Sequence, residues 1–205
     1  IGREVNPQNE DEFVLVFWPS NAPMPGHLIF RISDDVNNQF RVISDTNTWE
    51  AGVWHHVAIV IDSVRGIEMY IDGHLQRDTN SFNRPSATAN TITTVGCYGN
   101  NFYRYFKGKI DEVRLSAAAE YSGNFTPACP NQKSSPQTQG LWNLDEGIGN
   151  TAIDSSGSSN HASIINANYV KTCICAQGNT LFFDGQNASV DLGNQVGSGV
   201  RTVEM

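Results

Sequence analysis

Short apolar segments recur along the whole chain and constrain its fold more than any other feature of the sequence. Most are rich in β-branched or aromatic residues, and Gly, Asn, Asp, Ser or Pro bounds them. Only SAAAEY (116–121) has a helical composition, enough for a turn or two. Many short strands with turn signals between them predict an all-β fold, an antiparallel β-sandwich or jelly roll. The expected strands are 12–18, 27–32, 39–44, 55–62, 67–73, 91–99, 107–116, 140–145, 161–166, 179–185, 188–193 and 201–205.

The composition indicates a folded protein and argues against several partners. A chain of 205 residues is long enough for one large all-β domain or two small ones. Charged residues make up 17% and apolar residues 39%, which is too weakly charged for a disordered chain. The net charge is −8 and Lys and Arg do not cluster, so we expect no nucleic-acid partner. The apolar runs are too short to cross a bilayer, so we expect no membrane span.

The cysteines and sequons favour an exported protein. The four cysteines are Cys97, Cys129, Cys173 and Cys175, and they allow three fully paired connectivities that the sequence does not distinguish. A zinc site would need paired C-x-x-C spacing, which the chain lacks. We therefore expect one or two disulfides, formed in an oxidising compartment. The sequons NFT at Asn124 and NAS at Asn187 agree with an extracellular or cell-surface location.

Four segments carry a resemblance to one family. WEAGVWHHVAIVIDSVRGIEMYIDGHLQ (49–76) and YFKGKIDEVRLSAAAEYSGNF (105–125) resemble the later half of a laminin-G-like, concanavalin A-like jelly-roll domain. Residues 141–193 resemble the early half, with an acidic first strand ending D-E-G, a D-S-S-G-x-x-N-H turn and an F-D-G hairpin. RTVEM (201–205) resembles the strand that follows. The resemblance implies a concanavalin A-like sandwich, but this fold hosts lectins, adhesion modules and enzyme appendages, so it does not fix the function.

The two halves of this family pattern occur in swapped order. Residues 1–128, here called the head, resemble the C-terminal part of such a domain, and residues 141–205, the tail, resemble the N-terminal part. Residues 129–140 have the composition of a linker. Three arrangements are open: a window of a tandem array, a circular permutant whose tail folds onto its own head, or a chain whose tail completes the head of the next.

Neither part can bury its apolar face alone, because each would leave a sheet face and its edges in water. Each part therefore needs a partner sheet. Open heterologous association produces filaments, and strand complementation of an exposed edge is one route to them. We predict that the parts complement each other between copies of the chain or neighbouring repeats, in a head-to-tail surface filament or array.

No catalytic arrangement is apparent in the sequence. Glucanases of the same superfamily carry carboxylates at alternating strand positions, which point into one cleft. Here Asp111 and Glu112 are adjacent and would face opposite sides of a sheet, as would His55 and His56. No Ser-His-Asp or Cys-His arrangement suggests itself. We therefore predict that the protein is not an enzyme.

The resemblance also implies a calcium ion at the rim of the sandwich, held by Asp side chains and loop carbonyls. The candidate ligands by this resemblance are Asp111 and Asp184, one in each part of the chain, so a bound Ca²⁺ would join head and tail. The alternative is that both carboxylates cap turns or accept hydrogen bonds from loop amides.

The loop CYGNNFYRYFKG (97–108) is a candidate glycan site. Aromatic faces beside amide and guanidinium donors suit a shallow lectin site. The candidate ligand-binding residues are Tyr98, Asn101, Tyr103, Arg104 and Tyr105. The alternative is that Tyr103 and Tyr105 fill a sheet face or a contact between chains. Trp49 and Trp54, which flank a short turn, are interpreted as packing anchors.

The sequence as a whole predicts a non-enzymatic extracellular module with a structural or adhesive role. The alternative function is that of a carbohydrate-binding module attached to a larger secreted protein or enzyme.

Overall fold

A computed structural model of the chain describes residues 1–6, 10–18, 25–33, 39–79, 92–98, 104–128, 133–172, 178–194, 196 and 199–205. Within these ranges the chain forms strands and no helix, which confirms the predicted all-β fold. The strands are β1 (Gly2–Asn6), β2 (Glu10–Phe17), β3 (Leu28–Ser33), β4 (Gln39–Ile43), β5 (Val57–Asp62), β6 (Gly66–Ile71), β7 (His74–Thr79), β8 (Thr93–Val95), β9 (Lys107–Ile110), β10 (Val113–Ser116), β11 (Thr138–Trp142), β12 (Thr151–Ala152), β13 (Ala162–Ile165), β14 (Asn168–Thr172), β15 (Gly178–Asp184), β16 (Ser189–Asp191) and β17 (Thr202–Glu204).

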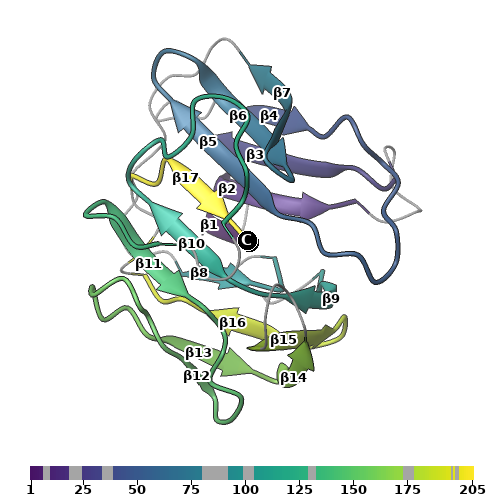
Figure 1. Cartoon of the computed structure of the whole chain (residues 1–205), viewed down its shortest axis with the longest axis vertical. Coiled ribbons are helices and arrows are strands. Elements are labelled where there is room, and N and C mark those ends of the chain that lie inside the picture. The colour runs from purple at the N-terminus through teal and green to yellow at the C-terminus, as the bar shows by residue number, and fades with distance from the viewer. Residues whose placement is uncertain are drawn as a thin grey trace.

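The strands form three antiparallel sheets (Figure 1). The eight-stranded sheet has the order β12-β13-β16-β8-β1-β2-β3-β4, and the six-stranded sheet has the order β11-β10-β17-β5-β6-β7. A three-stranded sheet, β14-β15-β9, accompanies them. The main apolar core contains Phe13 and Phe30 of the eight-stranded sheet together with Ile59 and Met69 of the six-stranded sheet, so the two larger sheets bury their inner faces in common.

The six-stranded sheet is buried on both faces. Alternate residues of its strands point into the main core, among them Ile59 of β5 and Leu115 of β10. The residues between them face outward, and there Ala58, Val60 and Tyr70 pack in a second apolar cluster, against Ala119, Tyr121 and Phe125. Burial on both sides explains why β5 and β6 read as nearly continuous apolar runs rather than as alternating strands.

The tail supplies strands to all three sheets and pairs with the head of its own chain. In Figure 1 the yellow strand β17 lies among strands from the early part of the chain, between β10 and β5. β16 pairs with β8, and β15 pairs with β9. In the structure the tail thus completes the sheets of the head of its own chain. Exchange of tails between chains stays a prediction.

Two predicted elements differ from the structure. The strand predicted at 107–116 is two strands, β9 and β10, which belong to different sheets because the backbone turns at Glu112 (φ +49°). The helical turn predicted at 116–121 is absent from these described residues. Their amides bond elsewhere: Ala117 N–H donates to the Gln137 carbonyl, Ala118 N–H to Ser116 Oγ and Glu120 N–H to Thr202 Oγ1. These three amides are therefore not available for helical hydrogen bonds.

The predicted linker is shorter than expected at its C-terminal end. Thr138, Gln139 and Gly140 belong to β11, which pairs with β10. Residues 129–132 lie outside the described residues.

Candidate functional site

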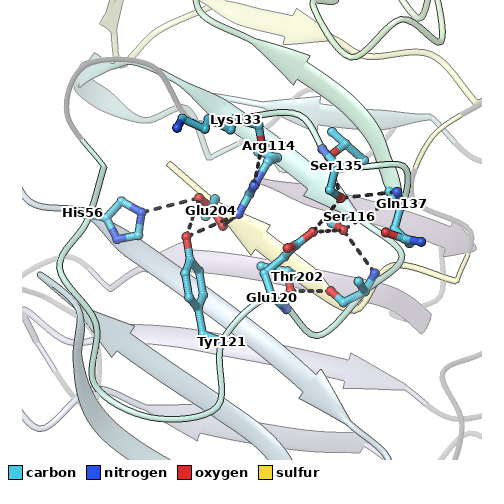
Figure 2. Close-up of polar contacts among 12 residues, drawn as sticks. His56, Arg114, Ser116, Glu120, Tyr121, Lys133, Ser135, Gln137, Thr202 and Glu204 are labelled. Atoms are coloured by element: carbon cyan, nitrogen blue, oxygen red, sulfur yellow. Dashed lines mark hydrogen bonds and ion pairs between the residues drawn. The ribbon is translucent and has the colours of Figure 1, made fainter.

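A buried polar cluster joins the tail to the head on the outer face of the six-stranded sheet (Figure 2). Its centre is Glu204 of β17, whose side chain has no exposed surface. Arg114 Nη2 donates to Glu204 Oε2 at 2.7 Å, and the Tyr121 hydroxyl donates to Oε1 at 3.2 Å. His56 Nε2 lies 3.7 Å from the same Oε1 atom. Burial, together with the Glu204 carboxylate, raises the pKa of Tyr121, so its phenol stays protonated and can donate.

Neighbouring hydrogen bonds hold the segment between β10 and β11, which connects the head to the tail. Thr202 Oγ1 donates to the Ala118 carbonyl at 2.7 Å, and Ser116 Oγ and Ser135 Oγ both donate to Glu120 Oε1. Figure 2 shows the side chains of Ser116, Glu120 and Ser135 pointing toward one another. The cluster is therefore suited to holding β17 and the connection in place.

The two carboxylates predicted to bind calcium are not brought together. In the pairing of β15 with β9, Asp184 lies opposite Lys107, and Asp111 follows the last residue of β9. Asp111 is four residues from Lys107, and at ~3.3 Å per residue this separates the Cα positions of Asp111 and Asp184 by roughly 13 Å along the strand direction. Asp184 caps its own turn, because Oδ1 accepts hydrogen bonds from the amides of Gln186 and Asn187, which lower its pKa. These are the contacts expected from the alternative interpretation, in which the carboxylate accepts hydrogen bonds from loop amides.

Asp111 has a different environment. It is half-buried, and its Oδ1 accepts a hydrogen bond from Glu112 N–H at 3.1 Å. The pKa of Asp111 is raised to about 7, mainly because the carboxyl is buried and further because the carboxylates of Glu112 and Asp145 are near it. Among the residues that the structure describes, no group of three His, Cys, Asp or Glu side chains is placed to hold a metal ion. The calcium site stays a prediction.

The raised pKa of Asp111 gives a testable pH dependence. The folded chain binds this proton more tightly than the unfolded chain, so the stability that Asp111 contributes falls as the pH rises from about 4 to about 7. We expect Asp111→Asn to raise the melting temperature at pH 8 and to have little effect at pH 4. Thermal melts between pH 4 and 8 test this, with Asp184→Asn as a control whose effect at pH 8 has the opposite sign. A difference between D111N and the natural chain that did not vary with pH would contradict the assignment.

The predicted glycan-binding residues are only partly described. Asn101 and Tyr103 lie outside the described residues. Tyr98 is 5% exposed, its hydroxyl accepts a hydrogen bond from Arg31 Nη2, and the Arg104 guanidinium lies 5.7 Å from its ring centroid. The Tyr98 ring is therefore engaged with protein groups rather than open to a sugar. Arg104 is exposed and Tyr105 is half-buried.

The cysteine predictions are likewise only partly described. Cys97 is a buried free thiol, so its predicted disulfide is not confirmed. Cys129, Cys173 and Cys175 lie outside the described residues.

An open hollow that the sequence did not reveal lies beside the turn between β6 and β7. Its volume is about 260 Å³. We call it the Trp49 hollow; its lining residues are Thr46, Thr48, Trp49, His55, Ile71, Asp72, His74 and Gln76. Trp49 is held as a packing anchor, because its Nε1–H donates to the Gly26 carbonyl at 2.6 Å, and it also lines the hollow.

Asp72 is the best-fixed polar group of this hollow. Its backbone is left-handed (φ +52°), and Gly73 follows with φ +76°. The carboxylate accepts a hydrogen bond from His55 Nδ1 and another from His56 N–H, both at 2.9 Å. The sequence Asp72-Gly73 is typical of a hairpin turn, but the approach of Trp49 to this turn depends on the fold.

The described part of the chain contains no helix long and apolar enough to cross a membrane.

Comparison with known protein families supports the β-sandwich fold. Residues 4–119, more than half of the chain, match the laminin-G-like family described as the concanavalin A-like lectin/glucanases superfamily. No curated protein and no solved structure gave a significant match. The chain belongs to the laminin-G-like family of the concanavalin A-like lectin/glucanase superfamily.

Proposed function

We propose that the chain is a non-catalytic extracellular module for adhesion, in which the tail of one copy can complete the head of the next. The observation that supports this is that all three sheets take strands from both parts, while one connection, from β10 to β11, joins them. The contacts that close one chain are the same contacts that would join two copies, which is the basis of domain swapping. Membership of the family supports a carbohydrate-binding or adhesive role.

The position of β17 makes such exchange specific. If β17 is withdrawn, β5 and β10 each lose a neighbour and Arg114 loses the buried carboxylate of Glu204. A head in this state can be completed by its own tail or by the tail of another copy. Closure on itself is favoured when chains are dilute, and exchange is favoured when chains are concentrated on a surface, because only exchange depends on chain concentration.

Charge-reversed variants test this exchange. Arg114→Glu alone would place two carboxylates in the buried cluster, and Glu204→Arg alone would place two guanidinium groups there. In an equimolar mixture, Glu204 of the first variant can meet Arg114 of the second across two chains. We expect refolded mixtures, separated by size-exclusion chromatography with light scattering, to contain dimers or larger species that hold both variants.

The double variant R114E/E204R, which restores a pair within one chain, is the matched control and should refold as a monomer when dilute. A mixture that behaves as the sum of its two components, while this control folds, would contradict exchange.

The calcium ion is proposed at Asp111 rather than between Asp111 and Asp184. The support is that Asp111 is half-buried and that the negative charges of Glu112 and Asp145 act on it, which favours a cation. Because no three acidic side chains among the described residues are placed to hold an ion, loop carbonyls would have to supply the remaining ligands. Addition of CaCl₂ at pH 8 should then raise the melting temperature of the natural chain and of D184N, but not of D111N. An equal shift in all three chains, or no shift in any, would contradict this assignment.

Carbohydrate binding is the second candidate function, and the Trp49 hollow favours it. An aromatic ring, a fixed carboxylate and several hydroxyl and amide groups line one open depression. Binding of the monomeric chain to a glycan array would support this function independently of any exchange of tails.

A further inference from the structure

We propose that the Trp49 hollow binds the end of a neutral carbohydrate chain. This inference rests on the second candidate function and assigns it to side chains outside the loop 97–108. The hollow combines three features that such a ligand needs, namely a rigid aromatic surface, a fixed hydrogen-bond acceptor and a lining without Lys or Arg.

The aromatic surface is a row of three rings. The Trp49 ring makes an edge contact with Phe17, with centroids 6.1 Å apart, and another with His55 at 5.0 Å. Phe17 is itself exposed, so the row reaches the surface. Because Trp49 is also fixed by its hydrogen bond to Gly26, a sugar face can pack on it without the entropic cost of ordering a mobile side chain.

The fixed acceptor is Asp72. Two hydrogen bonds from the protein use part of the capacity of this carboxylate, which has about four acceptor positions. The side chain of Asp72 is 48% exposed, so the remaining positions face solvent. Adjacent sugar hydroxyls can donate to them.

The turn that carries Asp72 is held from behind by the segment that follows β10. Phe125 N–H donates to the Gly73 carbonyl at 2.9 Å, and Leu75 N–H donates to Asn124 Oδ1 at 2.9 Å. A Cβ atom at Gly73 would collide with the Phe125 carbonyl, so the turn accepts only glycine there. The acceptor is therefore in position before a ligand arrives.

The charge of the lining selects the class of sugar. No Lys or Arg lines the hollow, and its one carboxylate is that of Asp72. A sulfated, sialylated or uronic glycan would bring a negative charge against this carboxylate, and the chain as a whole carries −8. The volume of about 260 Å³ is smaller than pockets that enclose drug-sized molecules, which suits one or two sugar residues at the end of a chain.

The test uses an array of neutral and anionic glycans, followed by NMR titration of the best ligand against the folded chain. Four chains are compared: natural, Asp72→Asn, Gln76→Ala and, as a matched control in the loop 97–108, Tyr105→Ala. We expect binding to neutral glycans, at least a tenfold loss of affinity in D72N, a smaller loss in Q76A and none in Y105A. The indole N–H signal of Trp49, identified with Trp49→Phe, should shift on titration while that of the buried Trp142 does not.

The outcomes separate the site from the function. Glycan binding that D72N and Q76A leave unchanged, in chains with unaltered melting temperatures, overturns the site but leaves carbohydrate binding standing. Binding to anionic glycans alone overturns the neutral class. Absence of binding to any glycan overturns both the site and carbohydrate binding, and leaves the exchange of tails to its own test.

Discussion

Replacing Arg114 with alanine is expected to lower the free energy of unfolding by roughly 3–5 kcal/mol, the cost of leaving a buried charge without its partner. Arg114 is 6% exposed and Glu204 has no exposed surface, so the Glu204 carboxylate would remain in the protein with only the Tyr121 hydroxyl and the more distant His56 near it. Urea denaturation, extrapolated linearly to water, measures the loss.

Two controls distinguish this effect from a general loss of side-chain packing. The double change Arg114→Met with Glu204→Leu removes both charges and should recover most of the stability, because apolar replacements of a buried ion pair are often neutral or stabilising. Arg65→Ala also leaves a buried carboxylate, that of Glu68, without its arginine, but the Arg65 side chain is 34% exposed, so water can reach the vacated position and we expect a smaller loss than in R114A. A loss in R114A no larger than that in R65A would show that the buried cluster does not hold the tail.

Replacing Trp142 with alanine is expected to cost about 3–5 kcal/mol, as large-to-small changes in a packed core do. Trp142 belongs to β11 of the tail, has no exposed surface, and donates from Nε1 to the Asn160 carbonyl at 3.0 Å. The core into which it packs also contains residues of the head, so the variant should destabilise both parts together.

Hydrogen exchange separates this expectation from an independently folded tail. In W142A, the amides of β5 in the head and β13 in the tail should gain exchange to the same extent, since one cooperative unit contains both. Trp54→Ala, at a half-buried position of the head, is the matched control and should change little. Loss of protection in β13 with full protection in β5 would mean that the head is stable without the tail, contrary to the shared core.

The sequence predicted strands best where burial is greatest. β3, β5 and β6 are rich in apolar residues, and their positions agree with the predicted segments to within a residue or two. β7 was missed because its sequence, HLQRDT, is polar, as suits a strand at the edge of a sheet with one neighbour. β14, with the sequence NYVKT, was missed for the same reason. Such strands form because they can pair with the free edge of an apolar strand, and the local sequence pattern does not reveal that pairing.

The candidate sites were harder to predict because they depend on the register in which strands pair and on which segments, distant in the sequence, lie close together in the fold. Asp111 and Asp184 both adjoin apolar strands in the sequence, but the pairing of β15 with β9 sets them far apart. Trp49 and Asp72 are conspicuous only as an anchor and a turn residue until the fold places them around one hollow. The sequence predicted that the two halves of the family pattern occur in swapped order. It did not predict which tail pairs with which head, because the same contacts satisfy either pairing.

The place of β17 has a consequence for biosynthesis. Ile61 of β5 and Arg201, just before β17, are hydrogen-bonded across 140 residues of chain. At ~5–20 residues per second, the ribosome needs roughly 7–30 s to add this stretch. Throughout that interval β5 lacks its neighbour β17, and so does β10 once it has been made. A chaperone or the finished tail of an earlier copy could cover these bare strand edges. If tails exchange as proposed, translation is therefore the period in which a tail from another copy can compete with the chain's own tail.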